Sequence, residues 1–465
     1  MRDQLVQILS ELSLTAQESS LILGALILLF TSLISANEVL LKCIFIFFLS
    51  IASYYSLQVS SFGFILSNSL LISHLNDKFS LLLIGSTALV VLFRRKKQVT
   101  EFYFLTLSLL VGGLFMTKAN SLLVVYLAVE LVSYSSYTLS GFSFTKKGNE
   151  AAIKYLLFGA VTSAILLVGL GLVYGATGSL YLSSLNAFLF NSALLQTGLL
   201  FVIFGIFFKA SIFPFHIWTP AVYQSAPVDA VAIFSIVPKL SGLILLHNLL
   251  SQIRFSTSHW VVEMVMLMGM ITVIAGTLGA LRQTNARRMI AFGSIGHTGF
   301  LFVFAIGNQL SMDAFWFYAL VYAIMNIAVF YIIHCFETHS IEQNNQYALI
   351  NNQTLMLVSF TFVLISLVGI PPLSGFTAKF FLFSYLWNWY QSSQSNWILA
   401  YLLITVFATV AALFYYLRIP YFYFFHSSME KREAKSIKIT LSVKIVTILL
   451  TFILLLLFFV PQLVI

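Results

Sequence analysis

The sequence predicts an all-α polytopic membrane protein with about 14 transmembrane helices. Apolar residues make up 60% of the 465 residues, and charged residues make up only 8%. Soluble domains contain roughly a quarter charged residues, so a water-soluble fold could not bury this much apolar surface. A helix crosses the hydrocarbon core with about 20 predominantly apolar residues, and segments of this kind follow one another along the whole chain.

The apolar segments give the order of the expected helices. They lie near residues 19–36, 39–56, 79–93, 102–117, 121–144, 150–174, 195–221, 229–250, 260–281, 286–306, 313–335, 354–389, 395–417 and 440–460. No stretch between them has the composition of a soluble domain. We therefore expect a single membrane domain over residues 1–465.

Prolines interrupt two of these segments, at Pro214 in the seventh and at Pro371 and Pro372 in the twelfth. Proline removes a backbone donor and clashes with the preceding turn, so each segment should divide into two half-helices. Both take the fourth place in a block of five spans, namely spans 4–8 and 9–13. Because five is odd, the two blocks enter the membrane from opposite faces, which predicts inverted repeats over 102–250 and 260–417. Residues 1–93 and 440–465 would form flanking helices.

Basic residues in short loops predict the orientation, because they accumulate on the cytoplasmic or matrix side. Odd-numbered loops and their flanks hold fourteen, and even-numbered loops with the N-terminus hold four. The fourteen are Arg94, Arg95, Lys96, Lys97, Lys146, Lys147, Arg282, Arg287, Arg288, Arg418, Lys431, Arg432, Lys435 and Lys438; the four are Arg2, Lys78, Lys118 and Arg254. Both termini should therefore face the intermembrane space or periplasm. The net charge of +9 reflects topology and lipid headgroups, with no nucleic-acid partner indicated.

Ionisable residues inside the spans are the candidate functional residues, because a charge at the bilayer centre costs about 2.5–3.5 kcal/mol. Of the fifteen carboxylates, only Glu130 lies well inside a predicted span, so we expect it to have a cationic partner. Lys209 precedes the break in the seventh span, Lys239 lies in the middle of the eighth, and Lys379 follows the break in the twelfth. Burial favours neutral forms and pairing favours charged ones. Opening or closing a Glu–Lys pair would therefore load or release a proton, which predicts a proton relay.

Five further residues are possible members of this relay. Lys154 lies about one turn into the sixth span, and His297 lies about eleven residues into the tenth, where an imidazole can pass a proton near neutral pH. His216 follows the break in the seventh span, and His247 and His334 lie nearer span ends. Each has a structural alternative, since a lone buried histidine is usually a satisfied core residue and a lysine near a span end reaches the headgroups.

Signatures of other chemistry are absent from the sequence. There is no phosphate-binding glycine loop, no hydrolase motif and no metal-ligand spacing of His and Cys. The two cysteines form neither a disulfide framework nor a thiolate site. We therefore expect this chain to bind no metal and no cofactor. The first eighteen residues lack the pattern of a cleaved transit or signal peptide, so we expect insertion in a bacterium or from an organelle's own genome.

Several stretches resemble the antiporter-like membrane subunits of respiratory complex I. They are EAAIKYLLFGAVTSAILLVGLGLVYGATGSL, FKASIFPFHIWTPAVYQSAPVDAVAIFSIVPKL, RRMIAFGSIGHTGF and GIPPLSGFTAKFFLF. The resemblance covers most of the chain. Within that family, the string WTPAVY favours the subunit N branch over its paralogues M and L, and the lysine at position 379 also argues against M.

The resemblance implies a non-redox, proton-translocating subunit of an NADH:ubiquinone oxidoreductase, driven by quinone reduction elsewhere in that complex. It implies that Glu130 pairs with Lys209, that Lys239 continues the axis, and that Lys379 is the terminal relay group. It also implies lipids and other membrane subunits as partners, especially the neighbouring antiporter-like subunit M/4 and the small subunit K/4L. The implied location is the mitochondrial inner membrane or, alternatively, a bacterial plasma membrane.

The sequence departs from the family pattern at three positions, where Ala221, Gln224 and Ser225 replace residues that are often acidic or glycine. These departures affect loop contacts and none of the four axis residues. Two other functions remain open at this point. One is a subunit of a multi-subunit sodium/proton antiporter, and the other is a structural membrane subunit in which the lysines only stabilise.

Overall fold

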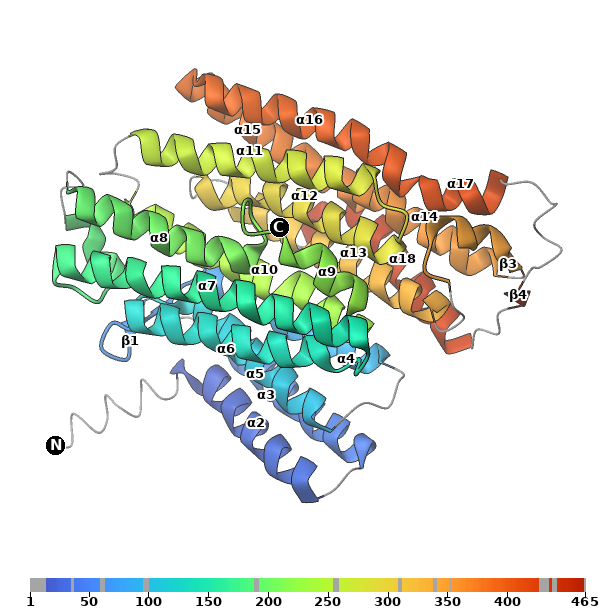
Figure 1. The fold of residues 1–465 in the computed structure, drawn as a ribbon, viewed down its shortest axis with the longest axis horizontal. Coiled ribbons are helices and arrows are strands. Elements are labelled where there is room, and N and C mark those ends of the chain that lie inside the picture. The colour runs from blue at the N-terminus through green and yellow to red at the C-terminus, as the bar shows by residue number, and fades with distance from the viewer. Residues whose placement is uncertain are drawn as a thin grey trace. The chain divides into compact units, whose positions relative to one another are not determined.

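The computed structural model describes residues 14–34, 37–58, 63–94, 100–187, 192–253, 259–307, 312–337, 341–351, 353–425, 435–436 and 441–463, and it is dominated by long α-helices (Figure 1). The chain divides into two compact units. The first contains residues 1–210 and 225–262, and the second contains residues 211–224 and 263–465. The predicted fold class, an all-α polytopic membrane protein, is confirmed.

The first unit holds the N-terminal helices and one small hairpin. Its helices are α2 (Ala16–Ile34), α3 (Glu38–Gln58), α4 (His74–Phe93), α5 (Glu101–Lys118), α6 (Leu122–Gly141), α7 (Lys146–Thr177), α8 (Ala193–Ala210) and α10 (Val228–Ile253), with the 3-10 helix η1 (Leu182–Ala187). Strands β1 (Gly63–Ile65) and β2 (Leu70–Ile72) pair antiparallel, with Gly63 opposite Ile72. This hairpin was not predicted from the sequence.

The second unit holds the remaining helices. These are α9 (Trp218–Ser225), α11 (His259–Leu281), α12 (Ala286–Ile306), α13 (Met312–Glu337), α14 (Thr354–Val368), α15 (Ser374–Ser393), α16 (Asn396–Tyr416), α17 (Arg418–Phe425) and α18 (Leu441–Phe459), with η3 (Asn344–Leu349) and η5 (Pro461–Leu463). A two-residue parallel pairing joins β3 (Ile350–Asn351) to β4 (Lys435–Ser436).

Among the described residues, 13 helices are long and apolar enough to cross a membrane. The remaining predicted span, the twelfth, is divided into α14 and α15. Each predicted span therefore has its counterpart, and most boundaries agree within about four residues. Local capping explains several starts: Ser73, Thr145 and Asn285 each accept a hydrogen bond from a backbone N–H of the first turn of α4, α7 and α12.

The structure interrupts the helix at both predicted proline positions. Helix α8 ends at Ala210 and α9 begins at Trp218, with Pro214 between them. Helix α14 ends at Val368, and Gly369 adopts φ of 88°, a left-handed conformation that favours glycine and ends the helix before Pro371 and Pro372. Each interruption leaves carbonyl groups at a helix end that need partners.

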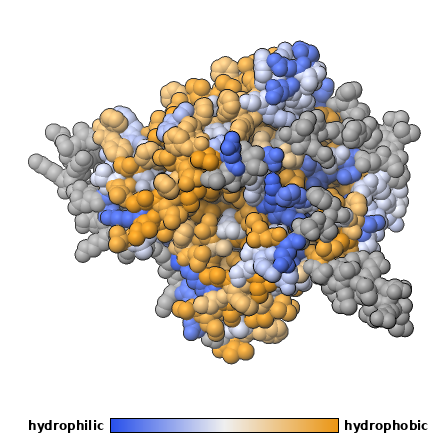
Figure 2. Space-filling view, turned by 180° about the vertical axis from the view of Figure 1, so that it is seen from behind, coloured by the Kyte–Doolittle hydropathy of each residue, from blue (hydrophilic) through white to orange (hydrophobic). Residues whose placement is uncertain are grey.

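Each unit has its own buried helices. In the first unit α10 is central, since 94% of its most apolar stretch is buried and it packs against α4, α5 and α8. In the second unit α12 and α13 are the most enclosed, at 94% and 83%. The peripheral helices α2, α3 and α18 expose large apolar side chains such as Leu33, Leu57 and Leu441. Figure 2 shows such side chains over much of one face, as expected for a surface that meets lipid.

Part of the charge pattern that predicts the orientation lies outside the described residues. This applies to Arg2, Arg95, Lys96, Lys97, Arg254, Lys431, Arg432 and Lys438. The assignment of the termini to the intermembrane space or periplasm therefore stays a prediction.

Close packing between the two halves of the broken twelfth span should make Gly375 intolerant of a side chain. Its backbone N–H donates to Ser366 Oγ at 3.2 Å, and a Cβ at this position would overlap the Ser366 carbonyl oxygen. We expect Gly375→Ala to lower the thermal unfolding temperature of the purified protein, at a cost of about 1–3 kcal/mol. Gly171→Ala is the control, because a Cβ there meets open space on α7. Equal unfolding temperatures for the two variants would contradict this packing.

Candidate functional site

Lys209, in the last turn of α8, is enclosed by aromatic side chains. Only 1% of the residue is exposed. Its Nζ donates to Tyr137 Oη at 3.5 Å and lies 5.2 Å from the centre of the Tyr137 ring and 5.1 Å from that of Phe208. Tyr137 packs at 4.7 Å against Tyr155, whose hydroxyl accepts from Ser136 at 3.3 Å. The ammonium therefore sits in an apolar chamber with phenol groups as its polar neighbours.

Glu130, on α6, does not contact Lys209 directly. It lies seven residues before Tyr137 on α6, so both residues share one face of the helix. The Glu130 carboxylate interacts electrostatically with Lys209 and with Tyr137. Among the described residues no contact ion pair joins Glu130 to Lys209, and Glu130 Oε1 is buried without a hydrogen bond. The pair that the resemblance implies is therefore not formed as a contact in this structure, and it stays a prediction.

Lys239 occupies the middle of the most buried helix of the first unit. It is fully buried and follows Pro238 within α10. Three residues later, Gly242 lies against Lys209 and Ala210 of α8, because a Cβ at Gly242 would meet both at about 3.6 Å. Lys209 and Lys239 are thus on neighbouring helices about one turn apart. The structure brings together the first three predicted axis residues in one unit.

Lys379 binds the carbonyl end of the half-helix that precedes it. Its Nζ donates to the carbonyl oxygens of Val368 at 2.7 Å and Leu367 at 3.1 Å. These groups are left without helical partners by the break at Gly369, and the C-terminal end of a helix attracts positive charge. The Phe300 ring lies 5.1 Å from the ammonium. The break in the twelfth span therefore creates the site that the buried lysine occupies.

His297, on α12, is the most enclosed of the predicted histidines. Only 2% of it is exposed, and its Nδ1 lies 3.1 Å from Tyr318 Oη. The Phe300, Tyr318 and Tyr322 rings surround the imidazole. Phenol groups thus accompany His297 in the second unit as they accompany Lys209 in the first.

The other candidate residues lie apart from these contacts. Lys154 is exposed and forms an ion pair of 2.5 Å with Glu150, one turn earlier on α7. His247 on α10 and His334 on α13 are buried near the helix ends. His216 stacks on Phe213 between α8 and α9.

One of the departures from the family pattern now has a contact. The backbone carbonyl of Gln224 accepts from Arg287 and its side-chain oxygen accepts from Arg288, both at 3.4 Å. Arg287 also pairs with Glu337. An uncharged residue at 224 therefore still binds the basic start of α12.

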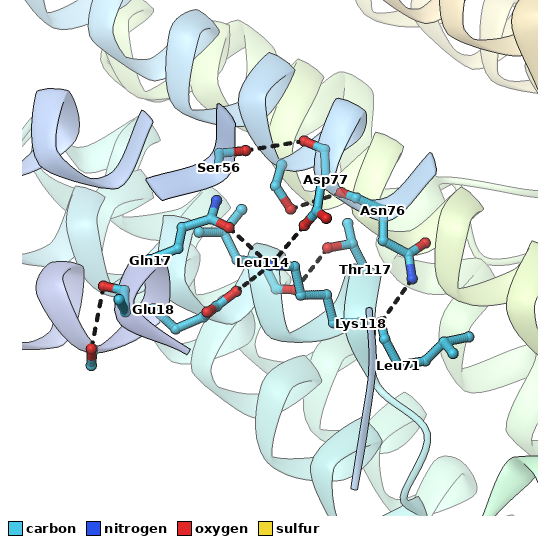
Figure 3. Close-up of polar contacts among 12 residues, drawn as sticks. Gln17, Glu18, Ser56, Leu71, Asn76, Asp77, Leu114, Thr117 and Lys118 are labelled. Carbon is cyan, nitrogen blue, oxygen red and sulfur yellow. Dashed lines mark hydrogen bonds and ion pairs between the residues drawn. The ribbon is translucent and has the colours of Figure 1, made fainter. Parts of the chain in front are cut away.

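Two charge clusters in the first unit surround buried basic residues and were not predicted from the sequence. Lys118 contacts Glu18, Asp77 and Gln17, as Figure 3 shows. Arg94 lies between Glu38 at 3.8 Å and Asp229 at 3.6 Å, with the Phe102 ring 4.2 Å from its guanidinium carbon. Burial lowers the pKa of Arg94 from its ordinary value, and the nearby Tyr103 and carboxylates oppose this effect.

A signal for both clusters was present in the sequence. Successive spans alternate in direction, so the starts of α2 and α4 meet the end of α5 on one face, and the starts of α3 and α10 meet the end of α4 on the other. Charges in the first or last turn of a helix have the appearance of loop charges, although helix packing buries Glu18, Asp77 and Lys118. Because successive spans alternate in direction, the residues of each cluster lie at the same end of their spans.

The described residues contain no group of three or more His, Cys, Asp or Glu residues that could hold a metal ion. Cys43 and Cys335 form no disulfide with each other.

Comparison with known proteins shows extensive similarity. The family described as NADH:quinone oxidoreductase/Mrp antiporter matches residues 119–410. The chain is 35% identical to NAD(P)H-quinone oxidoreductase subunit 2 from the chloroplast of Chlorokybus atmophyticus over 70% of this chain and 64% of that protein. It is 36% identical to the protein of the same name from Thermosynechococcus vestitus, over 72% and 65%. The chain thus spans slightly less than two thirds of these relatives. NADH-quinone oxidoreductase subunit N of Rhodospirillum rubrum is 31% identical, over 75% and 72%.

Solved structures show the same fold. A chain of respiratory complex I from Thermus thermophilus superposes with a TM-score of 0.80 at 25% identity, covering 96% of this chain and 98% of that one. A chain of the archaeal membrane-bound sulfane sulfur reductase gives a TM-score of 0.86 at 25% identity, covering 97% and 95%. A chain of the Mrp complex from Dietzia shares the fold at 20% identity, with a TM-score of 0.79 over 97% and 95%.

Removing the ammonium of Lys118 should destabilise the first unit. Lys118→Met leaves Glu18 and Asp77 buried without their cation, and breaking a buried ion pair in this way costs about 3–5 kcal/mol. We expect a lower thermal unfolding temperature, with a smaller loss at acidic pH because protonation neutralises the abandoned carboxylates. The exposed Lys147→Met is the control. A pH-independent loss, or none, would contradict the charge balance described here.

Proposed function

The chain belongs to the family of membrane subunits shared by NADH:quinone oxidoreductases and Mrp antiporters, and from this premise we propose that it is an antiporter-like, proton-translocating subunit of NADH:ubiquinone oxidoreductase, complex I. The observation that carries the proposal is the set of three buried lysines, Lys209, Lys239 and Lys379, which are at most 3% exposed and lie on the broken or central helices. The relatives at 31–36% identity are subunits of quinone-reducing complexes.

Buried lysines suit proton transfer because the environment controls their charge. Burial disfavours the ammonium, whereas a nearby carboxylate or a helix carbonyl end favours it. Glu130 acts on Lys209 in this way, and the end of α14 acts on Lys379. Small movements of these partners would change which lysine holds the proton. Glu130, Lys209, Lys239 and Lys379 are the relay we propose, with His297 and its tyrosine neighbour as a bridging group in the second unit.

Translocation requires energy from outside this chain. Moving one charge against 100 mV costs about 2.3 kcal/mol, and we assign no redox centre or bound cofactor to this subunit. The chain would act as the translocase part of the enzyme, while quinone reduction in other subunits alters the electrostatics around Glu130. The adjacent antiporter-like subunit M/4 and the small subunit K/4L are the neighbours we propose.

The places of the two broken helices and the bias of basic residues support the membrane topology that we propose. The two broken helices take equivalent places in spans 4–8 and 9–13, which supports two inverted repeats over 102–250 and 260–417. The chain is a multi-pass membrane protein, and we place it in the mitochondrial inner membrane, with a bacterial plasma membrane as the alternative. The bias of basic residues supports both termini on the intermembrane-space or periplasmic side.

Lys209 provides the test of the proposed function. In the assembled complex reconstituted into vesicles, we expect Lys209→Ala to lower the number of protons moved per electron while NADH oxidation continues, because the proton carrier of the first unit is lost. Tyr137→Phe should lower it less, since the ring stays and only the hydroxyl near Nζ is removed. Lys147→Ala, at the exposed start of α7, is the matched control.

The competing functions give different results. A sodium/proton antiporter subunit would show sodium-dependent proton flux without NADH oxidation. A purely structural subunit would keep its full proton stoichiometry in Lys209→Ala as long as the complex assembles. Either outcome would contradict the proposal.

A further inference from the structure

A second ionisable cluster in the first unit lies outside the proposed relay. Lys118 Nζ is 2.8 Å from Glu18 Oε1, 3.1 Å from Asp77 Oδ1 and 2.8 Å from Gln17 Oε1. Figure 3 shows the four side chains converging from α2, α4 and α5. Gln17, Glu18 and Lys118 are at most 2% exposed, and Asp77 is 6% exposed. The Gln17 contact is a hydrogen bond, whereas the Glu18 and Asp77 contacts are ion pairs whose oxygens have no hydrogen-bond partner.

The charges of this cluster do not balance. With every group ionised, two carboxylates surround one ammonium and leave one negative charge in a buried site. Among the described residues, no second cation forms an ion pair with Glu18 or Asp77. The charged groups that act on Asp77 are Lys118, Glu18 and His74, and His74 lies on the exposed side of α4. An uncompensated buried charge is costly, and two carboxylates close to each other cannot both ionise cheaply.

Unsatisfied atoms point to the same conclusion. Glu18 Oε2 is buried and has neither a hydrogen bond nor an ion pair, and Gln17 Nε2, in the same cluster, also lacks a hydrogen-bond acceptor. A carboxylate oxygen left in this state is expensive. A proton on either carboxyl group converts one oxygen into a donor and removes the excess charge at once.

The position of the cluster suits exchange with one face of the membrane. Glu18 and Asp77 lie in the first turns of α2 and α4, and Lys118 is the last residue of α5. The chain that follows Lys118 is covered by the β1–β2 hairpin, since the backbone N–H groups of Asn120 and Ser121 donate to the Ser69 carbonyl. The cluster is therefore near the end of the spans and still closed to water.

The cluster is also connected to the helix that carries Lys239. Asn248 Nδ2 donates to the Thr117 carbonyl at 2.9 Å, which ties α10 to the residue before Lys118. Lys239 is nine residues earlier on α10, so it lies about 14 Å deeper at 1.5 Å per residue. The cluster therefore lies between Lys239 and the face at which α2 and α4 begin.

We propose that Glu18, Asp77 and Lys118 form a second proton-binding site, in which the two carboxylates share one exchangeable proton and through which the first unit releases protons to the face where α2 and α4 begin. Binding forms one carboxyl O–H bond with a proton from the relay, and release breaks that bond and transfers the proton to water. Lys118 stays an ammonium throughout, and no electron moves. The release role rests on the proposed function, whereas the bound proton does not.

Two amide variants test this site without removing its ion pair. Glu18→Gln leaves Asp77 with Lys118, and Asp77→Asn leaves Glu18 with Lys118, so each retains one balanced pair and has no shared proton. In the assembled complex at neutral pH, we expect the infrared C=O band of one protonated carboxyl group to be lost in both variants. Asp77→Glu keeps the charge count and should retain the band. Glu101→Gln, at the exposed opposite end of α5, is the matched control and should also retain it. If either amide variant loses only carboxylate absorption and keeps this C=O band, Glu18 and Asp77 do not share a proton.

The release role is tested by the number of protons moved per electron, with Lys209→Ala as reference. We expect both amide variants to lower this ratio, as Lys209→Ala does, and Glu101→Gln to leave it unchanged. A lower ratio in Lys209→Ala with a normal ratio in both amide variants would overturn the release role alone. A normal ratio in Lys209→Ala as well would overturn the proposed function and the release role, and the infrared difference would still decide whether the cluster binds a proton.

Discussion

The cost of holding charge inside an apolar helical protein is the constraint on which the rest of this structure depends. With so few charged residues in the chain, each buried one needs a local reason. Lys379 has the carbonyl end of α14, Lys118 has two carboxylates and an amide, and Lys209 has phenol rings with a more distant carboxylate. The break in the twelfth span therefore stabilises the charge of Lys379, because it leaves carbonyl groups deep in the fold that the ammonium can bind.

The fold and the principal site residues were predictable because their signals are local. The length of each apolar run predicts a span, and proline predicts a break in it. An ionisable residue inside an apolar run, such as Glu130 or Lys239, is a candidate functional residue. Helix α12 was predicted at 286–306 and is observed from Ala286 to Ile306, since Asn285 caps it and Gly307 follows it. The hairpin at 63–72 carries no comparable local signal, and its strands are only three residues long.

The partners of these residues were less predictable because they depend on packing between helices. Tyr137 contacts Lys209 only because α6, α7 and α8 pack together, which no single segment encodes. Glu18 and Asp77 stand at span ends in the sequence, yet the helices around them bury both. Because successive spans alternate in direction, Glu18, Asp77 and Lys118 lie at the same end of their spans, so topology predicts that these three residues share one depth.

Proton transfer through the buried lysines of this chain is best examined at Lys239, because this residue occupies the most enclosed helix of the first unit. The measurement is the number of protons moved per NADH oxidised by the intact complex carrying Lys239→Met, in which a side chain of similar length cannot hold a proton. We expect a reduced ratio in a complex that assembles and oxidises NADH, because the buried proton carrier is lost. An unchanged ratio in such a complex would contradict proton transfer through Lys239.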